Sequence, residues 1–541
     1  MISAPKGFQG VFHTGLPARS AYSEGAGPYR IVPAAVAVPE DLDDLVRLVL
    51  RANDAGWHLI PRGAGSGMPG GNVGPGIVVD LSRFDRTPTL LGCDSAVAGA
   101  AVTRKALDDA ASSRKLRFPP DPSSGAYCTL GGMIATNAAG ARSVLVGSVR
   151  PWIQALDIVT GDGEFLSLAR GERSRSTGLG SRFASTVEPY ILQAVETIHQ
   201  RYPRVRKNSA GYALDAFIAS GDLLDLVIGS EGTLAFVTSA TVRVEPRPRC
   251  VAGLLIGLRA LEAVGAVAVD LLALRPAAVE LLDRSFLDMA QASVPFPIDD
   301  LAAVLLVDFE GPDADTTRAA VLAAAQTVSQ DVAFAHDALT GDEHARMWAL
   351  RHAASPVLAA LPEQRRSLQI IEDGCVPVEN LGTYLSEVRQ AAQEVGIDIV
   401  AFGHAGDGHL HVNALVDTTD PDFHSRIITL YQRVTESVIR LGGTPSGEHG
   451  DGRLRAGALY SVYGPEILGL FRVVKDVFDP GGIMNPGVVL ADEEASPLGA
   501  LKVGSQAEPV LPYIAAGLRR MERTGGWGTP KLELLLRDHP R

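Results

Sequence analysis

The sequence predicts a mixed fold of helices and strands, divided into two or more domains. Patterns typical of strands and of amphipathic helices alternate along most of the chain. At 541 residues the chain is long enough for several domains and for a large buried core. The patterns change near Pro246 and Pro248, after which the predicted helices are longer, so we expect a domain boundary there.

The composition is that of an ordinary globular protein, and it argues against several classes of function. The net charge of −13 disfavours nucleic acid or an anionic membrane as a partner. The four cysteines are scattered without a Cys-x-x-Cys pair, which argues against an iron–sulfur cluster of the usual spacing. The start of the chain has no apolar signal segment, and charges interrupt the most apolar region, residues 251–279. We expect a cytoplasmic protein; attachment to the periphery of a membrane is also compatible with the sequence.

In the first half, short apolar strands and helices lead into glycine-rich loops. Acidic residues in the first turn support the helix that begins at Asp41, and Gly161-Asp162 marks a hairpin turn. The expected elements, in order, are a strand at 34–38, a helix at 41–55, strands at 57–61, 76–81 and 96–101, a helix at 105–115, and a hairpin of strands at 155–160 and 163–167.

Two of these loops have the composition of a cofactor site. In residues 61–72, glycine and alanine leave little side-chain bulk, so several backbone N–H groups can turn toward one anion, such as a pyrophosphate. The spacing is neither that of a Rossmann motif nor that of a P-loop, and an exposed turn is the alternative. In residues 130–140, paired glycines and small residues allow a flat group to lie against the backbone, whether adenine, ribose or an isoalloxazine ring.

In the second half, longer helices alternate with strands. Arg351 follows Trp348 by one turn on a predicted helix, where it is either a surface arginine or a site residue. The expected elements are strands at 253–258, 279–282, 303–309 and 368–371, and helices at 261–274, 316–328, 342–361, 381–395, 423–441 and 468–477.

Residues 399–415 have the pattern of a tight hairpin that concentrates histidines. Five of the 12 histidines fall between residues 404 and 449. His409, His411 and Asn413 share one face by strand alternation, and His404 lies just before the turn. With Glu448 from a second glycine-rich loop, they form a set of ligands that suits a divalent transition metal. A polar hairpin with surface histidines is the alternative.

These motifs together resemble the flavoprotein superfamily of vanillyl-alcohol oxidase and p-cresol methylhydroxylase. Within it the chain is similar to the FAD-linked 2-hydroxy-acid dehydrogenases and oxidases, such as D-lactate dehydrogenase, D-2-hydroxyglutarate dehydrogenase and the D subunit of glycolate oxidase. The most specific motifs are Gly-His-x-Gly-Asp-Gly-x-x-His at 403–411, Gly-Glu-His-Gly at 447–450 and Asn-Pro-Gly at 485–487. The resemblance covers nearly the whole chain, in the family's order.

The resemblance implies an α+β fold, with a two-subdomain FAD-binding domain of the p-cresol methylhydroxylase type and an α/β, ferredoxin-like cap domain. It gives no argument for a covalent link to FAD. The implied division is a lead-in at residues 1–30, the FAD-binding domain at 31–250, the cap with the substrate and metal sites at 251–455, a return to the FAD domain at 456–491, and a tail of unassigned role at 492–541.

The resemblance also implies the site residues. His404, His411 and Glu448 would hold a divalent metal, commonly zinc. His449 would be the base that takes the hydroxyl proton near neutral pH, and Arg351 would bind the substrate carboxylate in a bidentate manner. Hydride would pass to the flavin N5. The residues expected to contact FAD are Arg62, Gly63, Ala64, Gly65, Ser66, Gly67, Pro120, Asp121, Gly131, Gly132, Asn137, Gly140, Glu231, Gly232, Val237 and Asn485.

Some positions depart from the family's pattern. Ala64 replaces a common glycine, and His409 stands where many relatives have asparagine, which adds a further candidate ligand. Residues 369–371 are mostly apolar where 2-hydroxyglutarate enzymes have a lysine for the second carboxylate. Because a buried carboxylate without a cation is costly, this disfavours 2-hydroxyglutarate unless Arg365 or Arg366 takes the lysine's place.

The resulting hypothesis is a metal-assisted, FAD-dependent oxidation of a D-2-hydroxy acid, D-lactate-like or glycolate-like, to the 2-oxo acid. Electrons would leave to a separate acceptor: a quinone, an electron-transfer protein or an iron–sulfur subunit. The alternatives are a flavin-binding subunit active only in a glycolate oxidase-type complex, D-2-hydroxyglutarate dehydrogenase, a metal-free alkyl-glycerone-phosphate synthase-type enzyme, and a zinc hydrolase. A homodimer is compatible with the sequence, and no nucleic-acid partner is expected.

Overall fold

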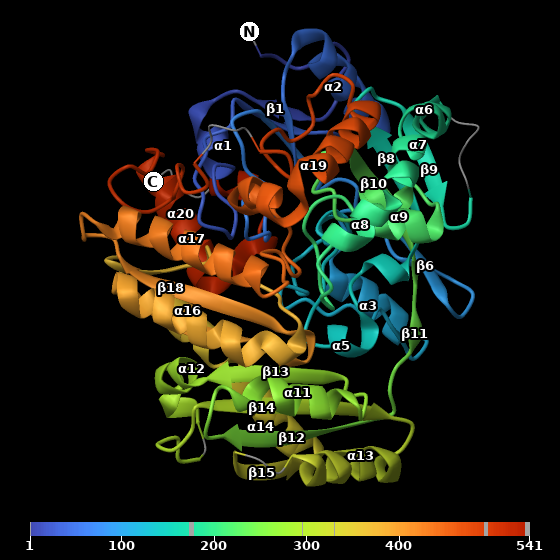
Figure 1. Ribbon diagram of the computed structural model, residues 1–541. Coiled ribbons are helices and arrows are strands. Elements are labelled where there is room, and N and C mark those ends of the chain that lie inside the picture. Colours follow the sequence, from blue (N-terminus) through green and yellow to red (C-terminus); the bar gives the residue numbers. More distant parts are fainter. Residues whose placement is uncertain (1, 173–177, 295, 329–330, 492–495, 536–541) are drawn as a thin grey trace.

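The computed structural model describes residues 2–172, 178–294, 296–328, 331–491 and 496–535. Within these ranges the strands form sheets of four, five and seven strands and one short pair. The seven-stranded sheet and its helices lie at one end of the molecule, and the two smaller sheets lie toward the other (Figure 1). No helix in the described ranges is both long and apolar enough to cross a membrane.

The first sheet contains, in spatial order, β1 (Val11–His13), β2 (Ala35–Val38), β4 (Ile77–Asp80) and β3 (Leu59–Arg62). β2, β4 and β3 are parallel, and α2 (Leu42–Ala55) connects β2 to β3. Asp41 caps α2 by accepting the Asp44 N–H at 2.9 Å, as the acidic start predicted. The strand–helix–strand order is confirmed, and the second strand runs into the glycine-rich loop.

The second sheet is antiparallel, and the predicted hairpin is its edge. It contains, in spatial order, β5 (Thr89–Leu91), β6 (Ser95–Gly99), β10 (Ala235–Arg243), β8 (Ile153–Thr160) and β9 (Phe165–Ala169). It shares one core with α3 (Arg104–Ser112), α4 (Leu130–Ala135), α6 (Gly178–Thr186), α7 (Glu188–Gln193), α8 (Val195–Arg201), α9 (Leu214–Ser220), α10 (Leu224–Val227) and α19 (Leu459–Phe478). The helices between 178 and 227 were not among the predicted elements.

The third sheet is also antiparallel and holds the histidine hairpin near one edge. Its spatial order is β15 (Val332–Ala338), β12 (Cys250–Leu258), β14 (Ala303–Gly311), β13 (Ala278–Asp283), β17 (Asp398–His404), β18 (His409–Asp417) and β16 (Arg365–Leu368).

Helices cover both faces of this sheet because its central strands are apolar on both sides. Leu281 and Leu305 face one core, whereas their neighbours Leu282 and Leu306 face another. The first core includes α11 (Ala263–Leu272), α13 (Ala314–Thr327), α16 (Leu381–Val395) and α17 (Phe423–Arg440); the second includes α12 (Arg284–Met289) and α14 (Gly341–His352). The cavity described below is lined by His344, Trp348 and Arg351 of α14, so it lies on the side of the second core.

Two predicted elements of this region are wrong in extent. The helix predicted at 342–361 is two helices, α14 and α15 (Ala354–Ala359). Pro356 has no N–H to donate to residue 352, so the hydrogen bonds of α14 do not continue. The strand predicted at 368–371 ends at Leu368, after which the chain leaves the sheet, and the Asp373 carbonyl accepts a hydrogen bond from the Gly447 N–H at 2.8 Å.

Both ends of the chain are more ordered than their composition suggested. β1 pairs with β2, and α1 (Leu16–Ala21) follows it. Near the other end, α20 (Pro512–Thr524) lies beside α1 (Figure 1). Ile514 and Leu518 of α20 share one core with Tyr22 and with Val36 and Val78 of the first sheet. The apolar face of α20 repeats every three to four residues, a signal that the sequence analysis missed.

Candidate active site

The histidine hairpin has the predicted form. β17 and β18 are antiparallel neighbours, with His404 opposite His409 and Gly408 at the turn in the left-handed region (φ 71°). His411 and Asn413 line a large cavity, and His404 joins them there. The hairpin is therefore not a surface feature, and all of these histidines are buried.

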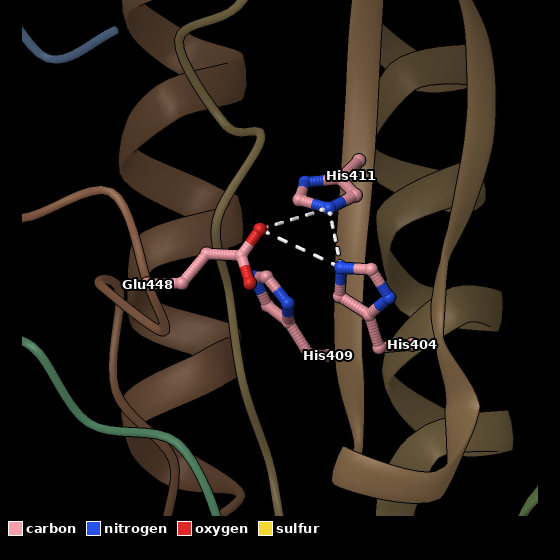
Figure 2. A group of neighbouring side chains, drawn as sticks. All are labelled: His404, His409, His411 and Glu448. Atoms are coloured by element: carbon pink, nitrogen blue, oxygen red, sulfur yellow. Dashed lines mark hydrogen bonds and ion pairs between the residues drawn. The ribbon is translucent and has the colours of Figure 1, made fainter. Parts of the chain in front are cut away.

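His404, His411 and Glu448 converge on one point (Figure 2). The two Nε2 atoms are 3.2 Å apart, and Glu448 Oε1 lies 3.5 Å from His404 Nε2 and 3.4 Å from His411 Nε2. Ligands about 2.0–2.1 Å from a tetrahedral zinc ion lie about 3.3–3.4 Å from one another. The three atoms therefore have the spacing of one face of a tetrahedral metal site.

The surrounding groups hold the Nδ1 atoms of His404 and His411 and turn their Nε2 atoms toward each other. His404 Nδ1 lies 2.5 Å from Glu280 Oε1, and His411 Nδ1 lies 3.1 Å from the carbonyl oxygen of Glu372. With each Nδ1 facing an acceptor, the two Nε2 atoms face each other, and a cation between them can take both as ligands. Lys207 donates to the other oxygen of Glu448 at 2.8 Å.

His409 is the fourth residue of this cluster (Figure 2). Its Nε2 lies 2.8 Å from Asp373 Oδ1, and its buried Nδ1 has no hydrogen-bond partner in the described part of the chain. Burial lowers the pKa of His409 to about 4, so the ring is neutral at physiological pH. Its role as a fourth ligand stays a prediction.

His449 lies beside the cluster and is held from both sides. Its Nδ1 is 2.6 Å from Glu372 Oε2, and its Nε2 is 3.3 Å from Glu448 Oε1. Burial opposes the charged imidazolium, but Glu372 and then Asp373 outweigh it and raise the pKa of His449 well above its ordinary value. This differs from the expected titration near neutrality, because the sequence did not show that Glu372 and Asp373 would lie against this ring.

Arg351 lies in the cavity wall, so its interpretation as a surface arginine is wrong. Its Nε lies 2.6 Å from Glu280 Oε2, its guanidinium lies over the ring of Phe402 at 4.6 Å, and its side chain is 11% exposed. Burial would raise the pKa of Glu280, but His404 and Arg351 outweigh it and lower it to about 2. Glu280 thus couples the histidine cluster to the arginine.

The cluster and the glycine-rich loops share one cavity of about 950 Å³. Such a volume is suited to a large cofactor together with a small substrate. Most of the residues expected to contact FAD line this cavity: Arg62, Gly63, Ala64, Gly65, Ser66, Gly67, Asp121, Gly131, Gly132, Gly140, Glu231, Gly232 and Val237.

Three of the expected residues, Pro120, Asn137 and Asn485, are not in the cavity wall. Asn485 is buried and donates to the carbonyl oxygens of Gly71 and Glu231 at 2.8 Å each, so it ties two loops together from behind. Arg62 does line the cavity, but its guanidinium also donates to the backbone carbonyl oxygens of Tyr22 and Glu24. Motif matching located the loops but did not show which side chains they bury.

The loop after β3 fits a diphosphate. Within the described residues, no backbone N–H of residues 63–67 donates a hydrogen bond to the protein, although all five residues line the cavity. Such a run of unpaired N–H groups forms an anion site. A Cβ on Gly63 would lie 2.4 Å from Thr129 Oγ1, so the loop packs directly on the neighbouring segment.

Sequence reasoning missed Glu280 and Lys207, which position the candidate ligands. Glu280 is a carboxylate inside the apolar strand β13, and an isolated charge in a buried strand is the signal that could have marked it. Lys207 is buried and lies in a segment without a periodic pattern, so no comparable signal was present.

The chain matches two family models. Residues 33–169 match the FAD binding domain, and residues 247–489 match the C-terminal domain of FAD linked oxidases. D-lactate dehydrogenase from Archaeoglobus fulgidus is 30% identical over 88% of this chain and 96% of its own length. Glycolate oxidase subunit GlcD from Bacillus subtilis is 29% identical over 88% and 93%.

A solved structure shares the fold. 4-Ethylphenol oxidase from Gulosibacter chungangensis aligns with a TM-score of 0.64 at 16% identity, over 89% of this chain and 94% of that one. This likeness supports an α+β FAD-oxidase fold, in agreement with the expected fold class.

Proposed function

Since the chain belongs to the FAD linked oxidases, we propose that it oxidises a D-2-hydroxy acid to the 2-oxo acid and passes the electrons to a separate acceptor. The observation that supports this most is the shared cavity. It brings the cluster of His404, His411 and Glu448, the His449 imidazole and Arg351 together with the loop at residues 63–67, whose backbone N–H groups have no partner within the described residues. FAD, when bound, supplies the two-electron chemistry that amino-acid side chains lack.

His404, His411 and Glu448 are the proposed ligands of a divalent metal, with zinc suited by the nitrogen and oxygen donors. A divalent ion there supplies a Lewis acid that lowers the pKa of a hydroxyl oxygen. Glu280, Lys207 and the Glu372 backbone orient the three ligands and would be needed for tight binding.

Arg351 is the proposed anchor for the substrate carboxylate. Its partner Glu280 holds it through Nε and also contacts His404, so Arg351 and the histidine cluster are joined by one carboxylate in the cavity wall. A guanidinium can bind a carboxylate through two parallel hydrogen bonds, which also orients the carbon that bears the hydroxyl group.

Arg351→Lys is expected to raise the substrate KM by about tenfold or more with a smaller effect on kcat, because one ammonium replaces a planar fork. Steady-state kinetics with an artificial electron acceptor measure this. Arg365→Lys is the matched control, since Arg365 pairs with Asp398 at 2.7 Å and lies outside the cavity wall. An unchanged KM in Arg351→Lys would remove Arg351 from the substrate site.

His449 is the proposed base for the hydroxyl proton, through its Nε2 atom. Because its pKa is raised, the ring holds a proton below that pKa and can accept one only above it. The rate of flavin reduction is therefore expected to rise with pH, with the rise on the alkaline side of about 6.5. Stopped-flow measurements between pH 5 and 10 test this, and a rate that falls as pH rises would contradict it.

The division of the chain follows from the same proposal. Residues 31–250 and 456–491 would form the FAD-binding domain, and residues 251–455 would form the cap, whose seven-stranded sheet carries the histidine hairpin. We assign the seven-stranded antiparallel sheet, which has helices on both faces, to this cap.

One observation keeps D-2-hydroxyglutarate as a second candidate substrate. Arg366 and Arg519 both line the cavity, whereas Arg365 does not. Arg366 lies 2.8 Å from Glu522 and 3.3 Å from Glu363, so its charge is partly neutralised within the protein. A substrate with a second carboxylate would find cations on this wall, although the position just before Glu372 is apolar.

The test is an anaerobic visible spectrum of the FAD-loaded protein before and after addition of D- and L-lactate, glycolate and D-2-hydroxyglutarate. We expect one D-acid or glycolate to bleach the flavin band. A flavin band that none of them bleaches, in the presence of zinc, would contradict the proposed reaction for the isolated chain. Bleaching that requires a co-purified second protein would favour the subunit of a glycolate oxidase-type complex.

A further inference from the structure

The C-terminal segment, residues 512–535, forms part of the wall of the cavity, although it lies outside both matched regions. α20 packs on the first sheet, and a 3-10 turn at Gly526–Gly528 follows it. A Cβ on Gly528 would lie 3.3 Å from Cβ of Tyr127, so this turn closes against the segment between the two predicted cofactor loops. Trp527 and Lys531 both face the cavity.

Lys531 is a buried lysine for which the described part of the chain offers no ion-pair partner. It is 4% exposed, and its Nζ lies 2.9 Å from Met521 Sδ and 4.4 Å from the centre of the Trp527 ring. Within the described residues, no carboxylate lies within ion-pair distance of this nitrogen. Lys502, a nearby buried lysine, pairs with Glu522 at 3.1 Å and does not line the cavity.

The environment of Lys531 suits an anionic ligand. Burial, and then the positive charge of Arg62, lower the pKa of Lys531 to about 7. Arg62, the last residue of β3, directly precedes residues 63–67, whose unpaired N–H groups line the same cavity. A buried ammonium near a second cation is costly unless anions compensate it. Glu24 and Asp80 oppose the lowering of the pKa, but neither forms an ion pair with Lys531, so an anionic ligand in the cavity would supply the missing partner.

We propose that Lys531 is a cofactor-binding residue whose ammonium group pairs with the diphosphate of FAD held on residues 63–67, and that the C-terminal segment closes the cofactor cavity. This proposal rests on the proposed function insofar as FAD is the ligand of the loop. It assigns a role to a segment for which sequence analysis found none, and it makes this segment a determinant of cofactor retention.

The test is the affinity of the apoprotein for FAD, measured by quenching of flavin fluorescence. Lys531→Met is expected to weaken FAD binding by about tenfold or more, and Lys531→Arg to retain most of it. Lys502→Met, the matched control, is expected to leave the affinity unchanged. An unchanged affinity for FAD in Lys531→Met would overturn the proposal. If that variant binds FAD normally but has a higher substrate KM, Lys531 serves the substrate and the proposal is likewise overturned.

A second measurement uses the unmodified protein, so it does not depend on how the variants fold. Lysine acylation followed by mass spectrometry is compared with and without FAD. FAD is expected to reduce labelling of Lys531 at least threefold and to leave Lys502 unchanged, whereas equal labelling of Lys531 in both states would overturn the proposal. A flavin that is retained through Lys531 yet not reduced by any hydroxy acid would refute the proposed reaction alone.

Discussion

Replacing His449 with alanine is expected to slow flavin reduction by the substrate about 100-fold or more, while FAD and the metal stay bound. The imidazole is the proposed base, and general bases contribute on this scale. Its Nδ1 lies 2.6 Å from Glu372 Oε2, and its Nε2 is thereby turned toward the cluster. The measurement is the rate of flavin bleaching in an anaerobic stopped-flow experiment.

The control is His336→Ala, because His336 is exposed on β15, far along the sheet from the hairpin. This variant is expected to reduce flavin at the normal rate. The absorbance of bound FAD and the metal content are measured in both variants, so that a loss of cofactor is not mistaken for a loss of the base. Normal flavin reduction in His449→Ala would show that another group takes the proton.

Replacing His411 with alanine is expected to remove the bound metal and to lower the rate of flavin reduction by about 100-fold or more, because several kcal/mol of charge stabilisation would be lost. The Nε2 atoms of His404 and His411 are 3.2 Å apart, so a single substitution breaks the face that holds the ion. Metal analysis of the purified variant and stopped-flow kinetics measure the two effects.

Removal of the metal from the unmodified protein by a chelator is the companion experiment. The rate of flavin reduction is expected to fall and to return when zinc is added back, with FAD retained throughout. If the His411→Ala protein and the chelated protein both reduce flavin at the normal rate, the cluster is not a metal site that serves this reaction. Loss that zinc does not reverse would indicate damage to the fold instead.

Strong local patterns account for what could be predicted. The hairpin at His404–His411, the helix at Leu381–Val395 and the strand–helix–strand unit before Arg62 each depend on turn chemistry and periodicity within a short window. The prediction of a single helix at 342–361 was wrong in extent, because one proline interrupts an otherwise helical pattern.

The sequence by itself determined which residue types are available for the site: the paired glycine-rich loops, the histidine cluster, Glu448 and His449. Tertiary structure decided which of them meet and how they are charged. Glu280, Glu372 and Lys207 are brought to the cluster from elements far apart along the chain. Glu280 orients His404, Lys207 holds Glu448, and Glu372 raises the pKa of His449. Lys531 is distant from every motif, and only the packing of α20 places it in the cavity wall. Contacts between distant segments follow from packing and burial, which no local pattern encodes.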